Sequence, residues 1–221
     1  MVARIMRTIV VVALLGAAVA CNAAPAVTIP SPNVDQPLAA TKGSEKVVLA
    51  GGCFWGIQAV FEHVKGVKHV TAGYSGGLAG TAQYETVSTG MTGHAESVEI
   101  TYDPSQVSYG QLLKVFFSVA HDPTEWNRQG PDEGTQYRSS IFYGTQDQKR
   151  IAEAYIDQLN KAKVYARSIV TQVVALKAFY PAEAYHQDYA VYHPNDPYIR
   201  INDLPKVEHL REKLPELFVS K

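Results

Sequence analysis

Cys53 has the surroundings of a reactive cysteine. It lies in the run GGCFWG, between a short apolar segment that ends at Ala50 and an apolar-periodic stretch that begins at Phe54. This pattern predicts that Cys53 opens a helix. Unpaired backbone N–H groups and the positive end of the helix dipole favour a thiolate there, so we expect the Cys53 pKa to lie below its free value of about 8.5. The two preceding glycines let a ligand approach the backbone closely. The sequence therefore indicates a nucleophile.

Glu96 is a candidate proton donor, because the segment that follows it alternates between apolar and polar residues. If strand pairing extends back to Glu96, its side chain shares a face with Val98, Ile100 and Tyr102. A carboxyl group on an apolar face has a raised pKa, since burial disfavours the charged form, and it can donate a proton near neutral pH. If the strand instead begins at Ser97, Glu96 is a solvated loop residue.

Strand and helix patterns alternate around both residues. Patterns typical of strands occupy residues 47–50, 67–74, 97–102, 139–143 and 170–176, and helical patterns occupy residues 54–64, 112–120 and 151–159. The order strand, helix, strand, strand, helix, strand is that of a ferredoxin-like core. We therefore predict an α+β fold, a two-layer sandwich with a ferredoxin-like core and added C-terminal helix and strand elements.

The N-terminus has the pattern of an export signal. Arg4 and Arg7 precede twelve uncharged residues, 9–20, a stretch too short to span a bilayer comfortably. The sequence before Cys21, Ala-Val-Ala, fits ordinary signal cleavage or a lipoprotein site at which Cys21 carries the lipid. We favour the second and expect a membrane-anchored lipoprotein, exported to the cell envelope or periplasm.

The chain divides into three parts on this interpretation. Residues 1–20 form the signal peptide, the Pro-rich residues 21–45 form an extended tether, and residues 46–221 form the folded domain. The chain has 221 residues, 46% of them hydrophobic, and a formal net charge of -1, which fits one globular domain. With no basic excess and no clustered metal ligands, neither nucleic acid nor a metal is expected, and we expect a monomer.

Three separated motifs resemble one enzyme family. GGCFWG, YETVSTGMTGHAE at residues 84–96 and HDPTEWNRQGPDEGTQYRS at residues 121–139 look like the A-type peptide-methionine sulfoxide reductases. The resemblance covers nearly all of residues 46–198. It implies a reductase for the S epimer of methionine sulfoxide, free or in proteins, with Cys53 as the nucleophile.

The resemblance also assigns the residues around Cys53. It implies that Glu96, Tyr84 and Tyr137 surround the sulfoxide oxygen, and that Phe54 and Trp55 form the pocket for the S-methyl group. Three further residues match positions that line or support the site, namely Asp132 in GPDEGTQYR and His186 and Tyr189 in AYHQDY.

These residue types can carry out a sulfoxide reduction without a bound cofactor. The sulfoxide sulfur is electrophilic, but its oxygen must be protonated as the thiolate of Cys53 attacks, and Glu96 can supply the proton. The tyrosine hydroxyls can stabilise the negative oxygen. The oxygen then remains on Cys53 as a sulfenic acid. Many members of the family carry a resolving cysteine near the C-terminus, where this chain has Ile199, and no cysteine follows Cys53. The tether is long enough to bring Cys21 to Cys53, but a lipidated Cys21 cannot form a disulfide. If Cys21 carries the lipid, we therefore expect an external thiol reductant, thioredoxin-like or glutathione-linked, to complete turnover.

Two other interpretations use the same residues. A Cys-His hydrolase or acyltransferase would pair Cys53 with His94 or His186, and Asp188 or Asp132 would orient the imidazole. A non-catalytic lipoprotein of the envelope would use the aromatic pair after Cys53 to hold a ligand.

Overall fold

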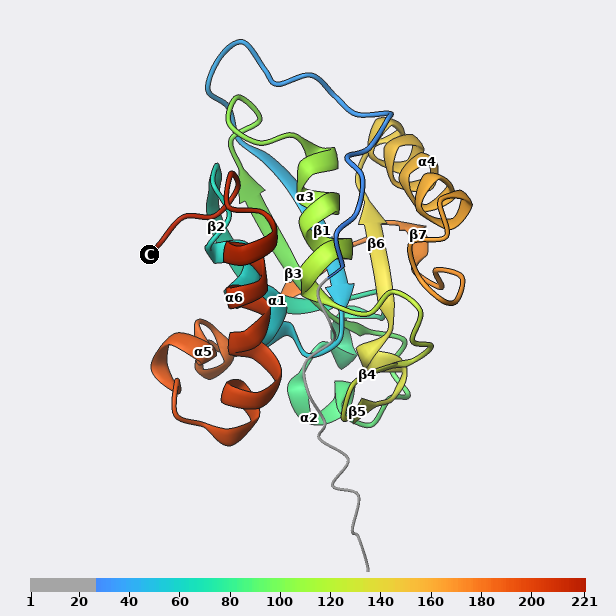
Figure 1. Ribbon diagram of the computed structural model, residues 1–221. Coiled ribbons are helices and arrows are strands. Elements are labelled where there is room, and N and C mark those ends of the chain that lie inside the picture. Colours follow the sequence, from blue (N-terminus) through green and yellow to red (C-terminus); the bar gives the residue numbers. More distant parts are fainter. Residues whose placement is uncertain (1–26) are drawn as a thin grey trace, which may run out of the picture.

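A six-stranded sheet forms the centre of the molecule. The structure, a computed structural model, describes residues 27–221, so the predicted signal peptide and Cys21 lie outside the described residues. The strands of this sheet are β1 (Glu45–Gly51), β2 (Val67–Ser75), β3 (Ala95–Tyr102), β6 (Ser139–Tyr143), β7 (Gln172–Ala175) and β8 (Phe179–Pro181) (Figure 1).

The strand order confirms the predicted fold class. The sheet has the order β7-β6-β1-β3-β2-β8, and its four central strands, β6-β1-β3-β2, pair with one another in antiparallel orientation. This is the arrangement of a ferredoxin-like core. The added strands extend both edges: β7 pairs with β6 in parallel, and β8 pairs with β2 in antiparallel orientation.

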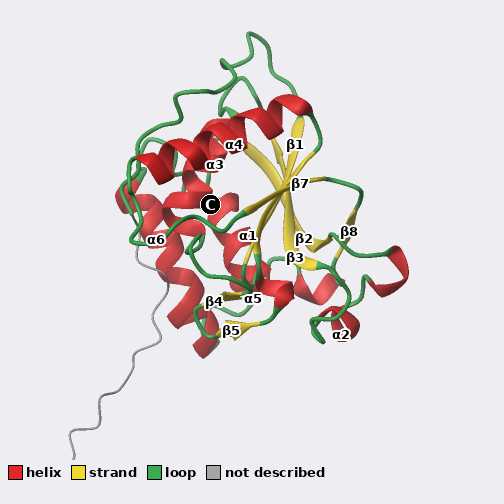
Figure 2. Cartoon of the chain, turned by 90° about the vertical axis from the view of Figure 1, so that its right-hand side faces the viewer, coloured by secondary structure: helices red, strands yellow, loops and turns green. Residues whose placement is uncertain are grey.

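Helices cover one face of the sheet. The helices are α1 (Phe54–Glu62), α2 (Tyr84–Val87), α3 (Tyr109–Val115), α4 (Gln146–Lys161), α5 (Tyr189–Tyr192) and α6 (Leu204–Lys213), and a small separate hairpin contains β4 (Arg128–Gln129) and β5 (Asp132–Glu133). Figure 2 views the sheet edge-on, with α1, α3, α4 and α6 on the same side of it. Between the two layers lies the main core, which includes the fully buried Leu49, Ile57, Phe61, Ile100 and Leu112. None of the helices in the described part of the chain is long and apolar enough to cross a membrane.

The helix predicted over residues 112–120 divides into two parts. Regular α3 ends at Val115, and residues Phe116–Ala120 continue as a π-helical turn in which every residue is buried. This segment therefore carries buried side chains on all of its faces, as expected for a helical turn that is enclosed within the core.

The N-terminal segment differs from the extended tether that we expected. Residues 27–44 form no regular element, but they run along the domain and contribute to its core through Ile29, which is 4% exposed. The Tyr155 hydroxyl of α4 donates to the Pro30 carbonyl at 2.7 Å, and the Gly110 N–H of α3 donates to the Asp35 carboxylate at 2.8 Å. A Pro-rich chain cannot pair its carbonyls internally, so they remain available to donors on the domain. The folded unit thus includes residues well before Lys46.

Candidate active site

Cys53 sits at the junction of β1 and α1. It is buried and occupies the N-cap position of α1, as the sequence predicted. The chain reaches it through Gly52, whose φ of +98° suits glycine, and where a Cβ would lie only 2.6 Å from the side chain of Gln129. A larger residue at position 52 would collide with the Gln129 side chain.

Glu96 belongs to the buried face of β3. The strand begins at Ala95, so the interpretation of Glu96 as a solvated loop residue does not hold, and its side chain is 3% exposed. The Phe54 N–H of α1 donates to Glu96 Oε2 at 3.1 Å. Burial raises the pKa of Glu96 to about 8, and the charges of Asp132 and Asp203 act in the same direction, while the Phe54 N–H opposes them. Glu96 is therefore a carboxylic acid that keeps its proton at neutral pH.

The ionisation of Cys53 differs from our expectation. Burial raises the pKa of the Cys53 thiol well above its ordinary value, and the charges of Glu96, Asp203 and Asp132 raise it further. Only the backbone N–H of Trp55 acts in the predicted direction. The helix start favours the thiolate, but desolvation and nearby carboxylates outweigh it. The empty site therefore holds a thiol.

Aromatic side chains cluster around Phe54 and Trp55, the two residues that follow Cys53. Trp55 stacks on Tyr189, with ring centroids 3.9 Å apart and an interplanar angle of 9°. The Trp55 indole N–H donates to His186 Nδ1 at 3.2 Å, and the His186 ring lies 5.1 Å from Phe54 and 4.4 Å from Tyr84. Because Nδ1 accepts this bond, the imidazole proton belongs on Nε2, which is buried and has no partner. His186 thus presents an unused donor within an aromatic cluster.

Tyr84 and Tyr137 both lie within the electrostatic influence of Glu96 and Cys53. Burial raises the pKa of each tyrosine, and the charges of Glu96 and Cys53 raise it further. Both residues are therefore neutral hydroxyl donors. Glu183, which the sequence analysis did not single out, positions Tyr84: its carboxylate accepts from the Tyr84 backbone N–H at 2.9 Å.

Three further residues near Cys53 escaped the sequence analysis. The Tyr198 hydroxyl donates to the Asp132 carboxylate, and Asp203 and Lys206 form a buried ion pair behind α1. All three follow Tyr189, which is the last residue in the chain that the resemblance assigns to the site. The sequence PYIRINDLPK carries one usable signal, since Asp203 and Lys206 are spaced to share a helix face.

The histidine and aspartate that a hydrolase would need are engaged elsewhere. His94 Nδ1 accepts from the Gly77 N–H at 3.2 Å, and its Nε2 lies 3.0 Å from the Leu78 carbonyl. The Asp188 carboxylate accepts from the Gln58 amide, and Asp188 occupies the N-cap position of α5. His186 uses its Nδ1 for Trp55 instead of for a carboxylate. Within residues 27–221, no group of three or more metal-ligating side chains gathers at one place.

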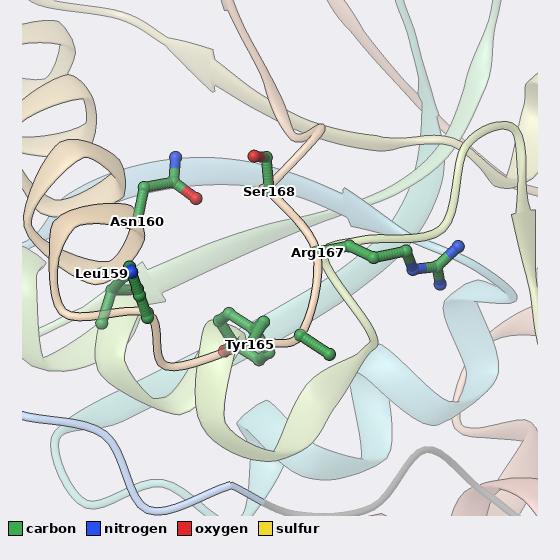
Figure 3. A pocket seen from close by; sticks show the side chains of 7 residues that line it. Leu159, Asn160, Tyr165, Arg167 and Ser168 are labelled. Atoms are coloured by element: carbon green, nitrogen blue, oxygen red, sulfur yellow. The ribbon is translucent and has the colours of Figure 1, made fainter.

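A hollow in the surface lies apart from these residues. It has a volume of about 490 Å³ and opens between the end of α4 and the loop 163–168 (Figure 3). Asn160 and Ser168 face it, whereas the Arg167 guanidinium points away, toward Thr124, to whose hydroxyl it donates at 3.0 Å. The Arg167 guanidinium is therefore already hydrogen-bonded, and Lys163 is the other cationic residue that lines the hollow.

Comparison with known proteins identifies the family. Residues 45–217 match the family model described as "Peptide methionine sulfoxide reductase". The chain belongs to this family. The match begins with β1 and ends after α6, so it includes every element that carries a side chain of the site described above.

Similar proteins of known sequence and structure agree with this membership. The chain is 61% identical over 182 residues to "Peptide methionine sulfoxide reductase MsrA 2" of Mesorhizobium japonicum, covering 82% of this chain and 93% of the relative. It is 57% identical over 187 residues to "Peptide methionine sulfoxide reductase MsrA 2" of Synechocystis, covering 84% and 87%. Among solved structures, methionine sulfoxide reductase A of Corynebacterium diphtheriae aligns with a TM-score of 0.59 at 34% identity, covering 78% of this chain and 87% of that one.

Reduced Mxr1 from Saccharomyces cerevisiae aligns similarly, with a TM-score of 0.62 at 30% identity over 74% of this chain and 92% of that one. The family and the high identity of these relatives establish the reaction. The protein is an enzyme with the activity of a peptide-methionine (S)-S-oxide reductase, which reduces methionine sulfoxide to methionine. The hydrolase and the non-catalytic binding protein have no support.

Proposed function

We propose that Cys53 is the nucleophile of this reduction and that Glu96 donates the proton. One observation carries the proposal: the same helix start holds both groups, since Cys53 is the N-cap of α1 and the Phe54 N–H bonds Glu96. A nucleophile and a protonated acid, both buried, are thus adjacent. Glu96 has a proton to give at neutral pH because burial raises its pKa to about 8.

The step balances in atoms and protons. The Cys53 sulfur attacks the sulfoxide sulfur while the sulfoxide oxygen takes the proton of Glu96, and the resulting carboxylate accepts the proton of the Cys53 thiol. The attack joins the Cys53 sulfur to the substrate sulfur. The sulfur–oxygen bond of the substrate then breaks as the hydroxyl oxygen bonds to the Cys53 sulfur, and the new sulfur–sulfur bond breaks with its electron pair on the substrate sulfur, which leaves methionine and a sulfenic acid on Cys53. The substrate sulfur is reduced to the thioether, the Cys53 sulfur is oxidised, and no net proton is consumed. Because Glu96 recovers a proton, one acid serves the whole step.

The neighbouring side chains fit supporting roles. Tyr84 and Tyr137 are neutral hydroxyl donors that can stabilise the oxygen as negative charge develops on it. Phe54 and Trp55 provide apolar surface for the S-methyl group, and Tyr189 supports Trp55 by stacking. Asp132 and His186 are, with Phe54, Trp55 and Tyr189, the residues that we propose bind the substrate. Burial of one methyl contributes only about 0.8 kcal/mol, so the site should accept methionine sulfoxide free or within many protein sequences.

Turnover requires an external thiol on this proposal. No cysteine follows Cys53, and Ile199, where a resolving cysteine is common in the family, is fully buried in a cluster with Ala59 and Ala190. We propose a thioredoxin-like or glutathione-linked donor, whose thiol attacks the sulfenic acid, releases water and forms a mixed disulfide that a second thiol reduces.

We also propose that the enzyme is an exported, monomeric lipoprotein, anchored through Cys21, that repairs oxidised proteins of the cell envelope. The docked N-terminal segment gives this proposal a geometric consequence. Val27, the first described residue, follows Cys21 by six residues, so the chain between them reaches at most about 22 Å. The domain would then stay close to the membrane surface. An intact mass of the mature protein that lacks a diacylglycerol on Cys21 would contradict the anchor.

A single-turnover experiment tests the chemistry. The mature enzyme, mixed with excess S epimer and no reductant, should form one equivalent of methionine per enzyme and a Cys53 that reacts with dimedone. The R epimer is the control and should yield neither product. Methionine formation without any dimedone adduct, at any time point, would mean that the oxygen does not pass to Cys53.

A further inference from the structure

Asp203 and Lys206 form an unusual ion pair on the C-terminal segment. Lys206 Nζ lies 3.1 Å from Asp203 Oδ1, and the two side chains are 10% and 0% exposed. It is the only salt bridge in the described part of the chain with both side chains buried. Burial of two charges costs several kcal/mol per ion before their attraction is counted, so stability alone is a poor reason for such a pair.

The pair lies directly against the catalytic helix. A Cβ on Gly56 would be 2.1 Å from Asp203 Oδ1 and 2.8 Å from Lys206 Nζ, so only a glycine leaves room for these charges. Gly56 follows Cys53 by three residues, and residues with this spacing share a helix face. The ion pair therefore packs on the first turn of α1, on the same side as the Cys53 side chain.

The pair is electrically coupled to the reacting groups. Asp203 Oδ2 is buried and has no hydrogen-bond partner, so this carboxylate depends on Lys206 for its charge compensation. The charge of Asp203 acts on Cys53 and on Glu96, and the charge of Lys206 acts on Asp203 and Asp132. The titratable groups that face the pair from the surrounding elements are Cys53, Glu96, His121, Asp132, Asp196 and Tyr198.

We propose that Asp203 and Lys206 are positioning residues for the reduction, which together set how readily Cys53 gives up its proton during attack. Lys206 neutralises Asp203, so the pair adds little net charge to a site that already contains two other acids. Removal of either partner leaves a charge of known sign beside the first turn of α1. The proposal depends on Cys53 as the nucleophile, but its test measures the thiol itself and needs no turnover.

The test compares three variants by the pH dependence of Cys53 alkylation with iodoacetamide. All are made in the full chain carrying Cys21→Ser, so that Cys53 is the only thiol. Asp203→Asn leaves the cation unbalanced, so the alkylation profile should move to lower pH by about one unit, with an about tenfold faster rate near neutral pH. Lys206→Met leaves the carboxylate unbalanced and should move the profile to higher pH. The double variant should lie close to the parent protein.

A matched pair on the same helix provides the control. Glu208 and Arg211 are also three residues apart on α6, but their side chains are 55% and 60% exposed, so Arg211→Met should leave the profile unchanged. Thermal melting accompanies each profile. If the pair has a purely structural role, the substitutions should lower the melting temperature and leave the alkylation profile unchanged. That result would overturn the proposal. Shifts of both single variants in the same direction would also overturn it. If Lys206→Met does not fold, Asp203→Asn and the double variant decide the question.

Discussion

Two helices of this enzyme begin in opposite ways. The start of α3 has a capping box: the Ser108 hydroxyl accepts from the Gln111 N–H at 3.1 Å, and the Gln111 side chain accepts from the Ser108 N–H at 2.9 Å. Asp35, from the distant N-terminal segment, accepts from the Gly110 N–H. These three contacts join backbone donors to oxygen acceptors, which stabilises a helix start, and the Ser108 hydroxyl also donates to the Asp35 carboxylate.

The start of α1 lacks this chemistry. Its N-cap is Cys53, which offers no capping oxygen, and the first turn contains no acidic residue. The Phe54 N–H instead bonds Glu96, a carboxylic acid of β3. At α3 the first backbone N–H groups bond to capping oxygens. At α1 the equivalent N–H of Phe54 holds the proposed acid, Glu96, beside the proposed nucleophile, Cys53. The same local geometry, a helix start, therefore contributes stability at α3 and positions the proposed reacting groups at α1. The difference depends on the N-cap side chain, which is Ser108 in α3 and Cys53 in α1.

The largest effect should come from the N-cap of α1. Cys53→Ser keeps the shape of the side chain but removes the thiol, so methionine formation from the S epimer with dithiothreitol should fall to the level of dithiothreitol alone. The melting temperature should change little, because this N-cap contributes no capping bond. Substantial residual turnover in Cys53→Ser would show that the start of α1 does not hold the nucleophile.

Glu96→Gln should lower the rate by about 10² to 10⁴, the usual contribution of a general acid, with a much smaller change in substrate affinity. Glu99→Gln, on the opposite face of the same strand and paired with Lys46, is the control and should retain full activity. Because the Glu96 pKa is about 8, the activity of the native enzyme should decline as the pH rises through this value. A wild-type rate in Glu96→Gln across the pH range would assign the proton to another group.

The same substitution should change the pH dependence of stability. The Glu96 pKa is about 8 in the folded state and near 4.5 in the unfolded state, so the folded protein binds one more proton between these values. The contribution of Glu96 to the free energy of unfolding is therefore fully present below about pH 4.5 and is lost as the pH rises through about 8. Urea unfolding at pH 9 should show Glu96→Gln to be more stable than the native enzyme, which is the opposite of the result expected for removal of a cap.

A chain that begins at Lys46 should be less stable than the longer protein. It lacks the buried Ile29 and the Asp35 carboxylate, so the free energy of unfolding should fall by about 3 kcal/mol. Activity per folded molecule should persist, because no residue before Lys46 belongs to the site. Urea unfolding monitored by circular dichroism measures the first quantity, and equal stability of the two chains would mean that residues 27–45 do not dock in solution.

The smallest effect should come from the cap of α3. Asp35→Ala removes one acceptor from a start that Ser108 and Gln111 still cap, so it should lower the free energy of unfolding by about 1 kcal/mol. Asp157→Ala, which breaks an exposed pair with Lys161, is the control and should cost less than about 0.5 kcal/mol. Both should leave kcat unchanged. A drop in kcat for Asp35→Ala would show that the start of α3 influences the reaction at the start of α1.

Features with a local cause could be predicted from the sequence. The strand and helix order follows from apolar periodicity, and the alternation after Glu96 correctly placed its carboxyl on the buried face of β3. The pattern before and after Cys53 correctly placed it at a helix start. For Glu96 the alternation gave the buried face only on the condition that the strand extends back to it, and the start of β3 at Ala95 meets that condition. Each of these properties depends on residues within a few positions of one another, so a single stretch of sequence contains the information.

Features that depend on distant residues were decided only by the tertiary structure. The helix start alone predicts a lowered pKa for Cys53, but burial and the carboxylates of Glu96, Asp132 and Asp203, from three separate segments, raise it. The docking of residues 27–44 likewise depends on donors from α3 and α4. Electrostatic energy and burial depend on distance in space, and residues far apart in the chain become neighbours only when the sheet and its helices have packed.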